Sequence, residues 1–134
     1  MPLFGQQHVE RYRATDGEEG HDWRGTQTLL LTTKGRKSGE PRTTPLIYAP
    51  YGDAHTVVAS KGGSDAPPAW YLNLSDDPRV EVQVKGDRFK ARARTASVEE
   101  KPGIWKTMVS EWPAYDIYQQ KTEREIPVVV LERV

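Results

Sequence analysis

The antiparallel character of the fold is decided by the stretch Val80-Glu81-Val82-Gln83-Val84-Lys85-Gly86-Asp87-Arg88-Phe89-Lys90-Ala91-Arg92-Ala93. Apolar and polar residues alternate over 80–84 and again over 89–93, which is the period of a strand with one buried and one solvent-facing side. Gly86-Asp87 between the two runs is typical of a tight turn. The stretch therefore predicts a β-hairpin, the simplest unit of an antiparallel sheet.

Shorter apolar and β-branched runs on both sides of the hairpin predict the remaining strands. They cover residues 28–33, 43–48, 55–60 and 126–131. Pro45 cannot donate a ladder hydrogen bond, so it indicates an edge strand or a bulge. The three histidines, His8, His21 and His55, show no metal-ligand spacing, and His55 is expected to be exposed or hydrogen-bonded.

Short helical segments separate some of these strands. Residues 69–74 predict one or two helical turns, and Ser97 and Glu100 have the spacing of a capping box that begins a helix running through Met108. Trp112-Pro113 ends that helix, and residues 115–122 predict another short one. About six antiparallel strands with a few short helices predict a mainly β protein, a small antiparallel barrel with helical inserts.

The composition excludes several classes of protein. The chain has 134 residues, 19 Lys+Arg, 19 Asp+Glu and no cysteine, which excludes disulfides and thiol nucleophiles and argues against a general nucleic-acid binder. No run reaches the length of a membrane span, so a cytoplasmic location is expected, and peripheral contact with a membrane stays open. Residues 1–25 are polar and interrupted by glycine, which predicts a flexible, loosely attached arm before a single domain over residues 26–134.

The connection Thr33-Lys34-Gly35-Arg36-Lys37-Ser38-Gly39-Glu40-Pro41-Arg42 is the strongest candidate for a binding site. It gathers Arg36, Lys37 and Arg42 with the hydroxyl of Ser38 between two predicted strands. Cationic side chains and free backbone N–H groups in one turn are typical of a phosphate or carboxylate site. A solvated hairpin tip explains the same residues equally well, and the composition does not choose between the two.

Three other segments are weaker candidates. Ser60-Lys61-Gly62-Gly63 ends a strand with residues that allow a ligand close to the backbone, although an ordinary loop would look the same. Trp70-Tyr71-Leu72-Asn73 is more often core packing than a cofactor wall. Trp112, Tyr115 and Tyr118 also suit a core, yet the two hydroxyl groups suit the wall of a pocket.

Four ordered motifs resemble the deazaflavin (coenzyme F420)-dependent nitroreductase and quinone reductase family. They are residues 30–42, 59–63, 70–74 and the stretch from Trp112 to Pro127. The resemblance covers roughly residues 28–134. It implies a split β-barrel of the FMN-binding type and use of reduced F420, and it leaves FMN open as a second cofactor.

The resemblance also implies roles for individual residues. The residues expected to bind the cofactor are Arg36, Lys37, Ser38, Arg42, Thr43, Thr44, Pro45, Leu46, Ile47, Val58, Ala59, Ser60, Lys61, Ala69, Trp70, Tyr71, Leu72 and Asn73. Trp112, Tyr115 and Tyr118 are expected to contact the substrate. Tyr115, Tyr118 and Ser60 are the expected catalytic residues, and no metal is expected.

The expected function is hydride transfer from reduced F420 to a quinone, an activated enone or a nitroaromatic compound. The protein would position the reactants, because the cofactor carries the chemistry. Two alternatives remain open, an FMN-dependent split-barrel reductase and a carrier that binds deazaflavin without turnover. The expected partners are a small-molecule acceptor and no nucleic acid, with no stable membrane insertion and either a monomer or a weak homodimer.

Overall fold

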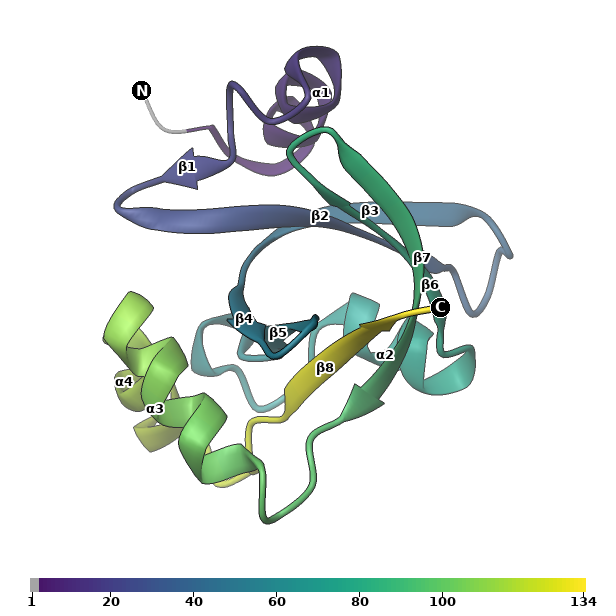
Figure 1. The fold of residues 1–134 in the computed structure, drawn as a ribbon. Helices are drawn as coiled ribbons and strands as arrows, with labels where there is room; N and C mark the ends of the chain where they lie inside the picture. Colours follow the sequence, from purple (N-terminus) through teal and green to yellow (C-terminus); the bar gives the residue numbers. More distant parts are fainter. Residues whose placement is uncertain (1–2) are drawn as a thin grey trace.

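The predicted hairpin is present in the computed structural model, which describes residues 3–134. Strands β6 (Arg79–Val84) and β7 (Asp87–Thr95) are paired in antiparallel register from Arg79 opposite Arg92 to Val84 opposite Asp87. Lys85 and Gly86 form the turn between them, and Lys85 has a φ of 54°. The hairpin lies at the centre of a larger curled sheet (Figure 1).

Within residues 3–134, eight strands form this sheet in the order β1-β2-β6-β7-β8-β5-β4, and β3 pairs with β2 outside that path. Every pairing is antiparallel. The remaining strands are β1 (Asp22–Trp23), β2 (Thr26–Lys34), β3 (Pro41–Ile47), β4 (Ala49–Tyr51), β5 (Ala54–Val58) and β8 (Val128–Arg133). The prediction of a mainly β, antiparallel split barrel is confirmed.

The strand count differs from the expected six because the chain changes partner at Tyr48. Before Tyr48, β3 pairs with β2, and after it β4 pairs with β5. The backbone N–H of Tyr48 donates to the carbonyl of Gln27 at 3.1 Å, which holds this corner. The two-residue β1 is the other addition. In the described part of the chain β3 pairs only with β2, so Pro45 lies on an edge strand as predicted.

Both faces of the sheet are covered, because successive side chains on a strand point to opposite sides. Leu29 and Leu31 of β2 and Val129 and Leu131 of β8 belong to the core inside the curl. On the outer face, the core includes Val128 and Val130 of β8 together with residues of α3 (Lys101–Glu111) and α4 (Ala114–Gln120). Figure 1 shows these two helices together beside β8.

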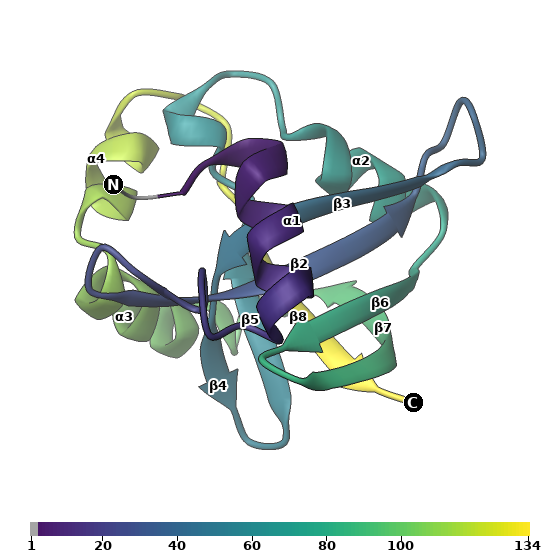
Figure 2. The same cartoon turned by 90° about the horizontal axis from the view of Figure 1, so that it is seen from above.

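The helix α1 (Gly5–Thr15) covers a third part of the sheet, and the expected loosely attached arm is not observed there. Val9 and Tyr12 are buried with Leu30 of β2. The Tyr12 hydroxyl donates to the carbonyl of Thr28 at 3.0 Å and accepts the N–H of Lys85 at 2.8 Å. Figure 2 shows α1 lying across β2. Burial of this helix was missed because its apolar stripe has only two members.

The predicted capping-box bonds are present, and they lie in the turn just before α3, which begins at Lys101. The N–H of Ser97 donates to the Glu100 carboxylate at 2.9 Å, and the N–H of Glu100 donates to the Ser97 hydroxyl at 3.2 Å. These reciprocal bonds are a capping box. Arg94 also donates to both oxygens of the Glu100 carboxylate, at 2.6 and 2.9 Å, which ties the start of α3 to β7.

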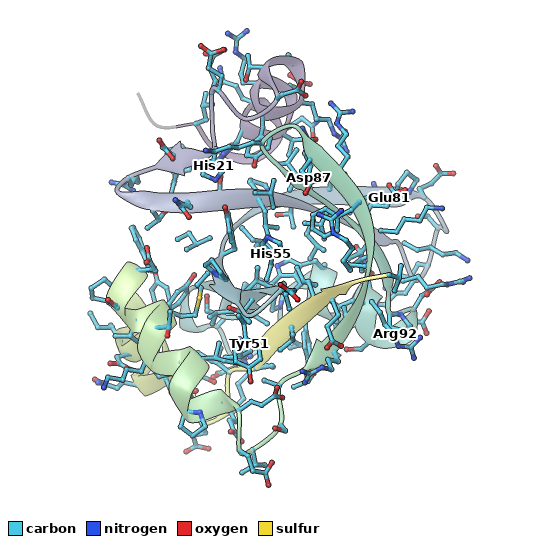
Figure 3. The ribbon with its side chains drawn as sticks, viewed as in Figure 1. His21, Tyr51, His55, Glu81, Asp87 and Arg92 are labelled. Atoms are coloured by element: carbon cyan, nitrogen blue, oxygen red, sulfur yellow. The ribbon has the colours of Figure 1, made fainter. Side chains whose placement is uncertain are left out.

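His55 of β5 lies inside the curl of the sheet (Figure 3). Its ring is 5.4 Å from that of Tyr48 and 5.6 Å from that of Phe89. The Nδ1 atom is buried and has no hydrogen-bond partner among residues 3–134, so the prediction of an exposed or hydrogen-bonded histidine is wrong. Burial, and then the nearby Arg133, lower the pKa of His55.

Candidate functional site

The cationic connection between β2 and β3 is a tight, hydrogen-bonded loop. The N–H of Gly35 donates to the carbonyl of Glu40, and the N–H of Gly39 donates to the carbonyl of Gly35, both at 2.8 Å. Gly39 has a φ of 75°, a conformation that glycine adopts without strain. The loop therefore has a defined shape at its base while Arg36, Lys37 and Ser38 stay exposed at its tip.

Asn73 holds this loop against α2 (Ala69–Asp76). Its side-chain oxygen accepts the backbone N–H of Arg36 at 3.3 Å and a guanidinium N–H of the same residue at 2.9 Å. Its side-chain nitrogen donates to the Thr33 hydroxyl at 3.1 Å. Asn73 is buried, so its amide links the end of β2, the loop and the helix in one network.

A cavity of about 380 Å³ lies beneath the loop, and we call it the cationic pocket. It is lined by Gly35, Arg36, Lys37, Ser38, Arg42, Thr43, Thr44, Ala69, Trp70 and Asn73. Within residues 3–134, Arg36, Lys37 and Arg42 form no ion pair with a carboxylate. Their positive charges are therefore free to bind an anion.

A larger cavity of about 470 Å³ continues from the cationic pocket. Thr44 of β3 and Trp70 of α2 line both cavities. The predicted site residues that line the larger cavity are Thr44, Pro45, Leu46, Ile47, Val58, Ser60, Lys61, Trp70, Trp112, Tyr115 and Tyr118. The two cavities are therefore neighbours, and we call them together the groove, which has a charged end and a mainly apolar end.

Three predicted cofactor residues line neither cavity. Ala59 is fully buried at the end of β5. Tyr71 and Leu72 lie on another side of α2 from Trp70 and Asn73, and the Tyr71 hydroxyl hydrogen-bonds that of Thr95 at 2.9 Å. A contiguous run on a helix points in several directions, so the whole run could not face one groove.

The loop after β5 is held in an unusual conformation beside the larger cavity. Lys61, Gly62 and Gly63 have φ values of 46°, 64° and 85°. The guanidinium of Arg124 donates to the carbonyl oxygens of Ser64 at 2.7 Å, Ser60 at 2.9 Å and Ala59 at 3.3 Å. No local pattern indicates this role of Arg124, because the three acceptors are backbone atoms 60, 64 and 65 residues away in the chain.

The loop also contacts α4 directly. A Cβ atom at Gly63 would lie 2.7 Å from the carbonyl oxygen of Tyr118, so only glycine allows this approach. Tyr115 is buried and Tyr118 half-buried in the cavity wall. The Tyr118 hydroxyl accepts the indole N–H of Trp112 at 3.4 Å. Burial, and then the neighbouring Tyr118, raise the pKa of Tyr115, so its hydroxyl stays protonated at neutral pH.

The N-terminal segment completes the larger cavity, and the sequence prediction missed this. Leu3, Phe4, Gly5, His8, Trp23 and Thr28 all line it. Trp23 joins the segment to the far wall: its indole N–H donates to the carbonyl of Leu3 at 2.7 Å, and its ring lies 5.6 Å from Phe4 and 5.8 Å from Trp112. The four-residue spacing between Phe4, which precedes α1, and His8 is the one signal in the sequence that could have indicated it.

The groove suits a deazaflavin cofactor by the chemistry of its donors. One end offers a hydroxyl and three cations that form no ion pair within residues 3–134, which suits the phosphate of a charged cofactor tail. The other end is lined by apolar and aromatic residues that suit a planar ring. A Cβ atom at Gly62 would meet nothing within 4 Å, so there is open space along this wall.

Comparisons with known proteins agree with this geometry. A family model described as F420H(2)-dependent quinone reductase matches residues 4–133. A quinone reductase of that description from Mycobacterium tuberculosis is 44% identical over 131 residues, which cover 94% of this chain and 87% of the relative. The match includes the N-terminal segment, which lay outside the resemblance expected from residues 28–134.

Two solved structures support the same assignment. An F420-H2 dependent reductase has a TM-score of 0.73 and 39% identity, covering 81% of this chain and 95% of that chain. A structure described as a domain-swapped dimer has a TM-score of 0.76 and 37% identity, covering 95% of this chain and 96% of that chain. The fold and groove thus define a split-barrel oxidoreductase. The chain belongs to the F420H(2)-dependent quinone reductase family.

No helix over residues 3–134 is both long and apolar enough to cross a membrane.

Proposed function

We propose that this protein transfers a hydride from reduced F420 to a quinone, and that activated enones and nitroaromatic compounds are further acceptors. The observation that carries the proposal is the single groove that joins the cationic pocket to the larger cavity through Thr44 and Trp70. Family membership supports the choice of F420 over FMN. Bound F420 in its reduced form supplies the hydride, and the chain supplies binding and orientation.

Arg36, Lys37, Ser38 and Arg42 would bind the cofactor phosphate at the charged end. Charge-assisted hydrogen bonds to a phosphate are strong and directional, and guanidinium groups contact it in a bidentate manner. Asn73 would then position Arg36 through the two hydrogen bonds described above. We propose that Asn73 positions Arg36 and does not contact the cofactor, because both ends of its amide already hydrogen-bond other residues of the protein.

The strand β3 and the loop after β5 would hold the deazaflavin ring in the larger cavity. Residues 44–47 and Val58 offer apolar side chains and a threonine, and Ser60 offers a hydroxyl beside them. Restricting the ring to this narrow space would orient it toward an acceptor, which lowers the entropic part of the barrier. Lys61 adds a positive charge at the rim.

Tyr115, Tyr118 and Trp112 would contact the acceptor. As hydride arrives, negative charge develops on an acceptor oxygen, and a tyrosine O–H can donate a hydrogen bond to it. Burial keeps the Tyr115 hydroxyl protonated, which suits a hydrogen-bond donor and makes Tyr115 a poor source of a full proton.

The deciding experiment compares three reductants on purified protein, reduced F420, reduced FMN and NADPH, with a naphthoquinone as acceptor. We expect rapid quinone reduction with reduced F420 alone, because the chain has no Gly-x-Gly-x-x-Gly turn for a nicotinamide dinucleotide. Turnover with reduced FMN at an equal rate would favour the FMN-dependent alternative. Tight F420 binding without turnover of any acceptor would favour a carrier.

We further propose that the protein is a monomer or a weak homodimer. The similarity to a structure described as a domain-swapped dimer supports a capacity to dimerise. Light scattering over a range of protein concentrations measures the oligomeric state directly. A molar mass that corresponds to more than two chains at every concentration would contradict the proposal.

A further inference from the structure

The reaction proposed above needs a proton as well as a hydride. A hydride brings one hydrogen nucleus and two electrons to a quinone, and the hydroquinone product carries two hydrogens. The second hydrogen must therefore arrive as a proton at an oxygen atom. The raised pKa of Tyr115 makes that hydroxyl a poor proton source.

His8 of α1 is the imidazole in the wall of the larger cavity. It is 2% exposed, so it is enclosed by protein on nearly every side. Its Nε2 atom lies 2.8 Å from the carbonyl of Gly20 and 3.4 Å from the Thr28 hydroxyl. Because a carbonyl only accepts, Nε2 carries a proton and donates it to Gly20.

The other ring nitrogen, Nδ1, has no hydrogen-bond partner among residues 3–134. It is also not sealed in the interior, since His55 Nδ1 is the buried side-chain atom without a partner in that range. Because His8 lines the larger cavity, that cavity is the space in which a bound ligand can reach Nδ1. A buried imidazole with one nitrogen engaged and the other free is the arrangement of a group that exchanges protons with a ligand.

The protein holds this ring in place on two further sides. The Trp23 ring is stacked against it at 6.4 Å, and Tyr12 lies 6.3 Å away. A Cβ atom at Gly20 would approach the His8 ring to 2.9 Å, so glycine is required for the carbonyl to reach Nε2. Within residues 3–134, the ring lies beside Tyr12, Gly20, Trp23 and Thr28, and of these four Tyr12 is titratable.

We propose that His8 is the proton donor to the acceptor, a role that rests on the proposed quinone reduction. The Nδ1–H bond of the protonated ring breaks, an O–H bond forms on the acceptor, and the neutral ring then takes a proton from water. Trp23 and Trp112 connect His8 to Tyr118 along one wall. A quinone has oxygens on opposite sides of its ring, so the two polar groups can serve one oxygen each.

Two variants separate this role from a structural one. His8→Gln places an amide near the position of Nε2, so it keeps the bond to Gly20 and loses the group at Nδ1. His8→Asn places an amide near Nδ1 and loses the bond to Gly20. Kinetics with reduced F420 and a naphthoquinone, F420 affinity and thermal unfolding are measured for both variants and the wild type.

We expect His8→Gln to unfold near the wild-type temperature, to bind F420 normally and to lose at least roughly tenfold in kcat, since general acids contribute about 10²- to 10⁴-fold. His8→Asn should unfold at a lower temperature. Full turnover by His8→Gln would overturn the proposal. If the wild type itself fails to reduce any quinone, the proposed function fails rather than this assignment.

A second readout does not depend on turnover. In protein carrying ¹⁵N-labelled histidine, the NMR signals of the His8 ring nitrogens are identified because they are missing from the spectrum of the His8→Gln variant. Addition of a naphthohydroquinone to the F420-free protein should shift the Nδ1 signal and leave Nε2 bound to its proton. An unchanged Nδ1 signal at saturating ligand would also contradict the proposal.

Discussion

Arg36 and Lys37 lie in one turn above the cationic pocket, and neither is neutralised by a carboxylate within residues 3–134. We expect Arg36→Ala and Lys37→Ala each to weaken F420 binding by roughly 1.5–3 kcal/mol, the usual loss of a hydrogen bond to a charged group. Fluorescence titration measures the affinity, and added salt should weaken it further. Lys106→Ala on the exposed side of α3 is the control, and equal affinity in all three variants would exclude the cationic pocket as the phosphate site.

The hydroxyl groups of Tyr115 and Tyr118 can be removed without removing the rings. We expect Tyr115→Phe and Tyr118→Phe to preserve F420 affinity and at least one to lower kcat, because an interaction made mainly in the transition state affects the chemical step. Loss of one hydrogen-bond donor to a developing oxyanion raises the activation free energy by about 2.7–4 kcal/mol in well-studied enzymes, which is the upper bound here. Steady-state kinetics test this, and wild-type kcat in the double variant would return both tyrosines to a packing role.

His55 should make the fold sensitive to mild acid. Its pKa is lowered from the ordinary value of 6.5 in the folded state, so the unfolded chain binds more protons as pH falls through that value. Stability contributed by neutral His55 is therefore present above pH 6.5 and lost below it. Urea unfolding at pH 7.5 and 5.5 should show a smaller loss in His55→Leu than in the wild type. A loss of equal size in both proteins would contradict this assignment.

At the scale of the elements, Arg124 connects the segment after α4 to the loop after β5. Its three carbonyl acceptors lose their partner in Arg124→Gln, and we expect a cost of about 1–3 kcal/mol in the free energy of unfolding. Because Ser60 and Lys61 line the larger cavity, F420 affinity should fall as well. Arg92→Gln, an exposed change on β7, is the matched control in chemical denaturation, and comparable unfolding curves for the two variants would show that the contacts are not stabilising.

The sequence predicted elements well where a local pattern matches the final surroundings. The β6–β7 hairpin needs only alternation and a turn, and the capping box of α3 needs only two residues three positions apart. The sequence-based prediction failed where the chain changes from one pairing strand to another. The single predicted strand over residues 43–48 is the end of β3 followed by a corner at Tyr48, since the chain leaves β2 to pair with β5.

At the scale of the whole molecule, α1 joins the barrel through Tyr12. Its hydroxyl bonds backbone groups of β2 and of the β6–β7 turn, and burial raises its pKa to about 12. We expect Tyr12→Phe to cost about 1–3 kcal/mol, because the Lys85 N–H loses its acceptor. Unfolding should remain one transition by circular dichroism and by tryptophan fluorescence. Tyr51→Phe is the control, and an earlier, separate transition of α1 would support a detached arm.

The sequence by itself determined the antiparallel barrel, the cationic loop and the resemblance to F420-dependent reductases, because each depends on residues that are close together in the chain. Only the tertiary structure decided that the cationic pocket and the larger cavity form one groove, and that Ala59, Tyr71 and Leu72 lie outside it. It also brought His8 and Trp23 into the lining of the larger cavity together with Tyr115 and Tyr118 of α4. Such contacts join segments as much as about 90 residues apart, and their formation depends on how the sheet curls, which no local pattern encodes.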